Sequence, residues 1–405
     1  MELQKTLQVR WLYLLVCSVG LLFVGVIYAW SILKVPLATE FGWTASQLAV
    51  NYTIMMCFFC LGSLTSGWLT KKWKLHQLLL LSGTMILIGY ALLAILPGGS
   101  LTALYLLYGV VIGGGIGISY NSLLATGNSW FPDRKGVSSG LMMMSFGFST
   151  MLLGKLAAHL FDMPSFGWRK TFLLLGISIA VVLAVCARIV RRPDASDQLP
   201  ERAAKNDKDD VQPMELMAKE MLRRPTFWIY YVYGFLNASV GSAVISFAKE
   251  LTITLGSTEQ AAVLLVGVLS ICNGFGRILC GISFDFVGRR KTMILATVIT
   301  VLAPAIMLVA IAGGSLPLAT ASLCLTGISY GTNPTISAAF MSSFYGMKDY
   351  ALNYSISNTK LLFSSLTATA AAALLSSTGS YFAPFVLLLV MSLLSLVLVF
   401  AIRRP

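Results

Sequence analysis

Residues 281–291 read G-I-S-F-D-F-V-G-R-R-K, a short polar segment between two long apolar stretches. The flanking stretches, 259–284 and 291–312, exceed the roughly 20 residues that a helix needs to cross a hydrocarbon core about 30 Å thick. Basic residues in such a short connection are typical of the cytoplasmic side of a membrane. The segment therefore predicts two membrane-spanning helices joined by a tight inner loop.

Ten more apolar stretches of similar length occur on either side of this pair. They cover residues 11–33, 45–69, 77–96, 101–127, 136–160, 169–188, 226–250, 315–342, 348–375 and 379–402. The chain of 405 residues is 57% hydrophobic and only 11% charged. Because that composition leaves too little polar surface for a soluble globule of this size, we predict an all-α membrane protein with twelve transmembrane helices.

The basic residues are distributed unequally across the predicted membrane. If the N-terminus is cytoplasmic, 22 of the 29 Lys and Arg fall in inner segments or at the termini. The outer loops contain only Lys34, Arg169, Lys170 and Lys249. This imbalance predicts a multi-pass protein of the cell (inner) membrane with both termini cytoplasmic. It also accounts for the formal net charge of +13 without a nucleic-acid partner.

A long polar segment, residues 189–224, divides the twelve stretches into two sets of six. It contains eight of the sixteen acidic residues, so we expect a solvated cytoplasmic linker with a short amphipathic helix over 213–223. The two halves share the sequence Gly-Ile-Ser-Tyr at 117–120 and 327–330, an offset of 210 residues. We therefore predict two pseudo-symmetric six-helix bundles, residues 1–188 and 225–405, with a binding site near the bilayer midplane.

The connection at 281–291 and the twelve-span layout resemble the major facilitator superfamily. The family signature G-x-x-x-D-x-x-G-R-[RK]-[RK] is matched by Gly281, Asp285, Gly288, Arg289 and Arg290. The resemblance implies that the carboxylate pairs with basic groups and a helix N-terminus, which holds one conformation. The equivalent loop at 67–74 reads G-W-L-T-K-K-W-K, with the glycine and the bases but no acid. We therefore expect the first half to lack this acid-to-helix contact.

Other motifs are similar to the oxalate/formate antiporter family within this superfamily, which is related to the monocarboxylate transporters. They are W-F-P-D-R-K-G at 130–136, Y-A-W at 28–30, N-G-F-G-R at 273–277, and Lys360 in the middle of the eleventh span. The resemblance covers the full chain in layout. It implies a transporter of small carboxylates.

Three cations remain inside the predicted spans, whereas every acidic residue falls in a loop, at a helix end or in the linker. Lys155 lies near the outer end of its span, so its side chain can extend to the interface. Arg277 and Lys360 lie deeper, where a charge costs about 2.5–3.5 kcal/mol even on a lenient scale. A guanidinium binds a carboxylate through paired N–H groups and a lysine acts as a mobile point charge, so both are candidate ligands of a small anion.

Aromatic and amide residues complete the predicted binding site. Tyrosines on the first, fourth and tenth spans can donate hydrogen bonds to a carboxylate and form an apolar wall, and asparagines near them add donors. The candidates are Tyr28, Tyr120, Tyr330, Asn121, Asn273 and Asn358. Asn273 precedes Arg277 by one helical turn, so we expect both side chains on one face.

Two buried cations without an acid predict a carrier that reorients mainly when it is loaded, because unpaired charge opposes closure of a low-dielectric cavity. The expected mechanism is exchange of mono- or dicarboxylate anions by alternating access, by a monomer in the lipid bilayer. The alternative is proton-coupled monocarboxylate symport, in which Lys360 gives up a proton when unloaded.

Other classes of function are disfavoured by the sequence. An enzyme is not expected, since the spans contain no acid and no paired histidine, and no pore-lining filter or large soluble domain indicates a channel or a sensor. The seven cysteines all lie in apolar stretches, so we expect no disulfide, no metal site and no cofactor. No small-residue cleavage site precedes the end of the first span, so this helix is expected to stay as an anchor.

Overall fold

The computed structural model describes residues 2–96, 99–163, 165–194, 197, 199–200 and 214–402. Up to residue 194 the helices are α1 (Glu2–Val24), η1 (Gly25–Ala29), α2 (Trp30–Phe41), α3 (Ala45–Leu69), α4 (Leu75–Ala94), α5 (Leu101–Leu104), η2 (Tyr105–Ile112), α6 (Gly113–Ser129), α7 (Lys135–Ser149), η3 (Thr150–Gly154), α8 (Lys155–Phe161) and α9 (Gly167–Ile189). From residue 214 they are α10 (Ala218–Leu222), α11 (Pro225–Thr254), α12 (Glu259–Phe286), α13 (Arg289–Gly313), α14 (Leu316–Tyr345), α15 (Tyr350–Asn358), α16 (Lys360–Thr378) and α17 (Phe382–Ala401). The described residues form no strand, so the prediction of an all-α membrane protein is confirmed.

Eleven helical stretches among the described residues are long and apolar enough to cross a membrane. The predicted span at 315–342 falls on α14, a helix of 30 residues that is not among the eleven. Its polar run Ser329–Thr335 lowers its hydropathy, and most of these polar side chains are buried inside the protein. The tenth predicted span is therefore a long helix whose composition reflects packing against protein rather than lipid.

Several spans are not regular α-helices. The first, predicted at 11–33, extends from Glu2 to Phe41 and tightens at η1 into a 3₁₀ turn. The segments η2 and η3 are wider π-helical turns, a form that is frequent near functional sites. The eleventh predicted span has an irregular turn at Thr359, between α15 and α16, within one continuous helical stretch. Apolar periodicity does not reveal these local departures.

Contacts along the chain group it into two units. Unit 1 consists of Met1–Arg134, Leu141–Ala203 and Asp349–Ile356, and unit 2 of Lys135–Gly140, Ala204–Lys348 and Ser357–Pro405. The irregular turn at Thr359 thus lies close to a unit boundary. The domain limits 1–188, 189–224 and 225–405 stay a prediction of the sequence.

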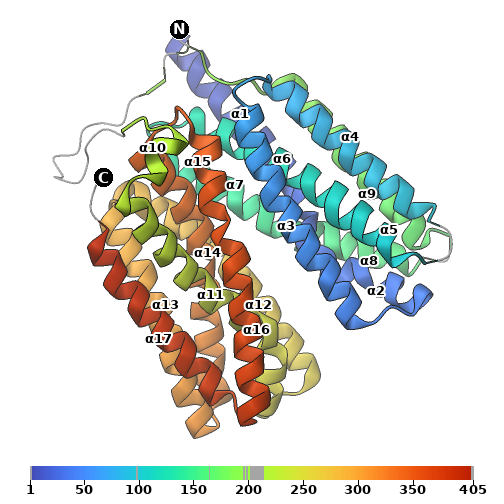
Figure 1. Ribbon diagram of the computed structural model, residues 1–405, viewed down its shortest axis with the longest axis vertical. Helices are drawn as coiled ribbons and strands as arrows, with labels where there is room; N and C mark the ends of the chain where they lie inside the picture. The colour runs from blue at the N-terminus through green and yellow to red at the C-terminus, as the bar shows by residue number, and fades with distance from the viewer. Residues whose placement is uncertain are drawn as a thin grey trace. The chain divides into compact units, whose positions relative to one another are not determined.

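In unit 2 the helices α11, α13, α14, α16 and α17 pack side by side (Figure 1). Their apolar core includes fully buried residues of α11, α13 and α17, such as Val244, Met307 and Leu388. In unit 1, α4 packs along α9 and α3 along α6. Large apolar side chains remain exposed on the outer faces of both sets of helices, as expected for surfaces that contact lipid.

The amphipathic helix predicted at 213–223 is shorter in the structure. Residue 213 lies outside the described residues, and the helix α10 comprises only Ala218–Leu222. The backbone N–H groups of Met214 and Leu216 instead donate to the carbonyls of Phe344 and Tyr345, at 3.1 and 2.9 Å. Pairing with the end of α14 keeps residues 214–217 out of a helix, so the predicted first turns of the helix are wrong.

Candidate functional site

Lys360 is the first residue of α16, directly after the irregular turn at Thr359, and its side chain is fully buried. Its ammonium Nζ donates to Ser337 Oγ at 2.6 Å, to Tyr230 OH at 3.4 Å and to Ser357 Oγ at 3.5 Å. It also lies 4.8 Å from the centre of the Tyr230 ring. All these groups are neutral, and among the described residues no carboxylate forms an ion pair with Nζ. The buried amine of Lys360 is thus held in unit 2 by hydroxyl groups.

Arg277 lies on α12, also in unit 2, with 5% of its surface exposed. Its Nε donates to Asn273 Oδ1 at 3.3 Å, as the one-turn spacing of the two residues predicts. Asn273 thereby orients the guanidinium from the preceding turn. Arg277 and Lys360, the two cations that lie deepest in the predicted spans, therefore both belong to unit 2.

Two other predicted ligands lie in unit 2. Tyr330 is half-buried on α14, and its ring lies directly over Gly241 of α11, where an added Cβ would overlap ring atoms. Asn358 is the last residue of α15 and is 3% exposed. Tyr330 therefore contributes to the packing of α14 against α11. Asn358 lies two residues before Lys360.

Three predicted ligands lie in unit 1. Tyr28 belongs to η1, and its ring centre is 5.2 Å from that of Phe146. Tyr120 on α6 also contacts Phe146, at 4.8 Å between ring centres, and its hydroxyl is 2.7 Å from the Tyr354 hydroxyl. The structure therefore brings Tyr28 and Tyr120 onto one aromatic side chain. Neither Phe146 nor Tyr354 was identified from the sequence.

Asn121, the third candidate in unit 1, is fully buried. Its Nδ2 donates to the backbone carbonyls of Ser63 on α3 and Ala351 on α15, each at 3.0 Å. Both N–H donors are therefore occupied by helix-to-helix contacts. This arrangement supports a role for Asn121 in tying α15 to α3 and α6.

The signature loop after α12 contacts the start of α7 within unit 2. Asp285 Oδ1 accepts from the Gly136 N–H at 2.9 Å and Oδ2 accepts from the Val137 N–H at 2.7 Å. Gly281 approaches the Gly136 carbonyl so closely that a side chain there would overlap it. A carboxylate at the first N–H groups of a helix is favoured by the helix dipole. The acid-to-helix contact implied by the signature is present in this structure.

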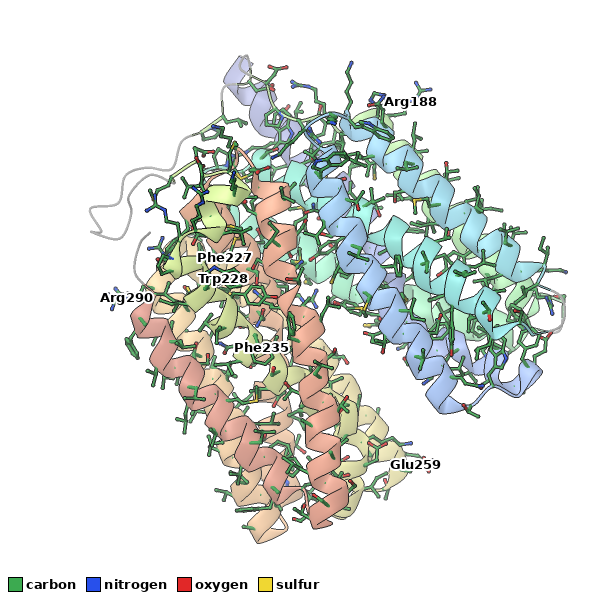
Figure 2. All side chains as sticks on the ribbon, viewed as in Figure 1. Arg188, Phe227, Trp228, Phe235, Glu259 and Arg290 are labelled. Atoms are coloured by element: carbon green, nitrogen blue, oxygen red, sulfur yellow. The ribbon has the colours of Figure 1, made fainter. Side chains whose placement is uncertain are left out.

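The other residues of the signature shape the start of α13. Gly288 precedes this helix with φ 97°, a backbone conformation that strains residues with a side chain. The guanidinium of Arg289 lies 3.8 Å from the centre of the Phe344 ring. Arg290 is exposed and points away from the helices of unit 2 (Figure 2).

The equivalent loop of the first half also contacts a helix start, although it carries no acid. Lys71 Nζ lies 3.0 Å from Asp349 Oδ2, and Asp349 directly precedes α15 in unit 1. A Cβ added to Gly67 would lie 2.7 Å from the Leu352 Cα on the first turn of α15. The loop of the first half thus reaches the helix start through a base instead of an acid, because here the acid comes from the helix side.

The motif at 130–136 is anchored by charged residues of unit 1. Trp130 and Phe131 are fully buried, and Trp130 Nε1 donates to the Arg191 carbonyl at 2.8 Å. Asp133 accepts from Arg10 at 2.7 Å, and the Arg10 guanidinium lies 4.8 Å from the centre of the Phe131 ring. The motif thus ties the N-terminal helix and the start of the linker to the end of α6.

The groups around Lys360 were missed by sequence reasoning. Tyr230 and Gly234 lie on α11 between Trp228 and Phe235, which Figure 2 labels, and Ser337 lies on α14. The available signal was weak, since a serine or tyrosine within an apolar helix is common. Only the contacts of the fold identify which hydroxyl groups meet the lysine.

Lys155, the third cation of the spans, is exposed and begins α8 directly after the π-helical turn η3. Within the described residues, His, Cys, Asp and Glu form no group of three that could hold a metal ion. The seven cysteines are free thiols.

The family model described as Major Facilitator Superfamily matches residues 15–248 and 234–405. The oxalate:formate antiporter of Oxalobacter formigenes is 24% identical over 359 residues, which cover 87% of this chain and 83% of that protein. The uncharacterized MFS-type transporter YhjX of Escherichia coli (strain K12) is 27% identical over 355 residues, or 86% of this chain and 83% of that protein. Monocarboxylate transporter 12 of Homo sapiens is 25% identical over 278 residues, which cover 62% of this chain and 52% of that protein.

Solved structures share the fold at low sequence identity. The proton:xylose symporter XylE superposes with a TM-score of 0.74 at 13% identity, covering 98% of this chain and 96% of that one. The human organic anion transporter MFSD10 superposes with a TM-score of 0.71 at 17% identity, covering 96% and 99%. These likenesses concern the fold alone.

Proposed function

Because the chain belongs to the major facilitator superfamily, a family of membrane transporters, we propose that it exchanges small carboxylate anions by alternating access. Such a multi-pass transporter is not an enzyme. The proposed location is the cell (inner) membrane with both termini cytoplasmic, and the proposed substrates are short mono- or dicarboxylates.

The observation that carries the proposal is the pair of buried cations in unit 2. Arg277 is 5% exposed and Lys360 is fully buried, and both lie within predicted membrane spans. Acidic residues of the described chain lie at helix ends or in connecting segments. A site with two cations and no acid attracts anions, and a guanidinium combined with an ammonium suits carboxylate oxygens. Relatives whose names specify oxalate, formate and monocarboxylates support this choice of substrate.

Exchange follows from the energetics of the empty site. Closing a low-dielectric cavity around two cations is unfavourable, and a bound anion reduces that penalty. The loaded carrier should therefore reorient faster than the empty one. The proposed ligands are Arg277 and Lys360, with Tyr28, Tyr120, Tyr330, Asn273 and Asn358 as further candidates, while Asn121 donates to backbone carbonyls in this structure.

The test is counterflow into proteoliposomes preloaded with oxalate, formate, lactate or pyruvate. Fast uptake of the labelled acid into preloaded vesicles and little uptake into empty vesicles is expected. Arg277→Ala and Lys360→Ala should each abolish the exchange, whereas Lys155→Ala, which removes an exposed cation from another span, should retain it. Equal uptake into empty and loaded vesicles would contradict exchange, and full activity of both variants would contradict the site.

Proton-coupled monocarboxylate symport is the second candidate. It is favoured by the burial of Lys360 among neutral acceptors only, since such an amine can release its proton when no anion is bound. In that case an inward proton gradient should accelerate uptake into empty vesicles and the external medium should become more alkaline. Exchange without a proton gradient effect would exclude this candidate.

A further inference from the structure

The hydroxyl groups around Lys360 form a directed hydrogen-bond network in unit 2. Ser337 Oγ donates to the Asn333 carbonyl at 2.8 Å, and Tyr230 OH donates to Ser337 Oγ at 3.0 Å. Each hydroxyl hydrogen therefore already has an acceptor. The oxygen atoms that face the Lys360 Nζ consequently present lone pairs, at 2.6 Å from Ser337 and 3.4 Å from Tyr230.

A third acceptor and an aromatic face complete this environment. Ser357 Oγ lies 3.5 Å from Nζ, and the Tyr230 ring centre lies 4.8 Å from it. The ring is held in place by stacking on Phe340, with 3.8 Å between ring centres and 7° between planes. An ammonium has three N–H donors and no acceptor, and it is attracted to an aromatic face. The arrangement of three acceptors and one ring thus fits the charged form of the lysine.

The space for the lysine side chain depends on Gly234 of α11. A Cβ at this position would lie 2.7 Å from Nζ, 2.9 Å from Cε and 3.0 Å from Cδ of Lys360. The Gly234 carbonyl accepts from Asn333 Nδ2 at 2.9 Å, which fixes the backbone at this point. Because the whole end of the lysine lies against this glycine, any side chain at 234 would displace it from the hydroxyl groups.

We propose that Gly234, Tyr230 and Ser337 are positioning residues that hold Lys360 as an ammonium in the substrate-free carrier. We call these three residues the lysine seat. This inference rests on the proposed function, since it assigns to the seat the task of keeping a positive charge available for an incoming carboxylate. The only titratable group that α11 brings to Nζ is the Tyr230 hydroxyl, and α14 and α15 bring the serines Ser337 and Ser357.

The seat should matter most when the proton concentration is low. Hydrogen bonds from a charged donor are stronger than those between neutral groups, so each lost acceptor favours the uncharged amine. An uncharged amine no longer attracts the anion. Removing a hydroxyl should therefore weaken anion binding, and the loss of affinity should be larger at alkaline pH. A change in helix packing alone would weaken binding equally at each pH.

The experiment measures KM and kcat of counterflow between about pH 6 and 8.5, on either side of neutrality, with the fastest of the four acids named above. Ser337→Ala is expected to raise KM roughly tenfold at neutral pH, with a steeper rise of KM toward alkaline pH than in the unsubstituted protein. Tyr230→Phe should act in the same direction, and Ser337→Thr, which keeps the hydroxyl, should restore KM. Gly234→Ala should also raise KM, since it displaces the lysine without removing an acceptor.

Ser364→Ala is the matched control, because Ser364 is a buried serine one turn after Lys360 whose Oγ donates to the Leu361 carbonyl. It should leave both KM and its pH profile unchanged. An unaltered pH profile in Ser337→Ala and Tyr230→Phe would overturn the seat, as would an equal rise of KM in Ser337→Thr and Ser337→Ala. If Ser337→Ala cannot be reconstituted into liposomes, the pH profile of KM in Tyr230→Phe alone tests the lysine seat. Absence of exchange of all four acids by the unsubstituted protein would instead refute the proposed function.

Discussion

The double substitution of Lys71→Asp with Asp349→Lys should retain the attraction between these two side chains, whereas either substitution alone should remove it. In the structure Lys71 Nζ lies 3.0 Å from Asp349 Oδ2, with 47% of the lysine side chain and 5% of the aspartate side chain exposed. Lys71→Asp would place two carboxylates together, and Asp349→Lys would place two ammonium groups together. The double variant restores an opposite-charge pair at the same two positions.

The expected size of the effect follows from the exposure of the two groups. A pair with one half-exposed partner contributes about 1 kcal/mol, since water and salt screen it. Asp349→Lys should cost up to about 1 kcal/mol more, because Asp349 precedes α15 and a cation is unfavourable at a helix N-terminus. The double variant should thus remain less stable than the unsubstituted protein. The coupling energy of the cycle should nevertheless be favourable by about 1–2 kcal/mol.

Thermal unfolding of the four proteins in one detergent at low salt measures this coupling. For a chain of this size 1 kcal/mol corresponds to a shift of about 1 °C, so replicate melts of all members of the cycle are required. The matched control is the reversal of Arg169 and Glu40, a 2.6 Å pair in the same unit with both side chains 41% exposed, which should show a smaller coupling. A double variant whose loss equals the sum of the single losses would refute the role of the Lys71–Asp349 pair, and a coupling unaffected by added salt would refute its electrostatic origin.

Two further predictions concern the signature loop of the second half. Asp285→Asn should destabilise the protein by about 1–3 kcal/mol, because the carboxylate accepts from two N–H groups at the start of α7, and a melting curve at low and high salt would measure this loss. Gly288→Ala should cost about 1–3 kcal/mol through its φ of 97°; Gly267→Ala, at a helical glycine with no atom within 4 Å of an added Cβ, should not destabilise. Equal melting temperatures of the two alanine variants would contradict the strain at Gly288.

The helices could be predicted because bilayer thickness imposes a length of apolar sequence on each span. Local departures could not be predicted, because they depend on contacts between distant residues. The irregular turn at Thr359, for example, lies near the point where the chain passes from unit 1, in which Tyr354 and Ala351 are hydrogen-bonded, to unit 2. The linker helix α10 is shorter than predicted for the same reason, since Met214 and Leu216 pair with the end of α14.

Sequence alone could indicate candidate ligands only where burying the residue type in a membrane carries a free-energy cost. Arg277 and Lys360 stood out because a charge inside a membrane needs an explanation. The residues that hold Lys360 are a tyrosine, serines and a glycine, which are unremarkable in an apolar helix. Asn121, another candidate ligand, donates to two backbone carbonyls in the structure, contacts that its place in the sequence does not reveal.

The loops at 67–74 and 281–291 make equivalent contacts in the two halves of the chain, but the positions of acid and base are exchanged. Lys71 follows Gly67 at the same spacing as Asp285 follows Gly281, and both positions are offset by 214 residues, as are Lys135 and Asp349. In one half the acid lies on the loop and meets the helix that begins at Lys135. In the other the base lies on the loop and meets the acid that precedes α15. Because opposite signs attract in either order, the loop at 67–74 retains a contact that its lack of an acid seemed to exclude.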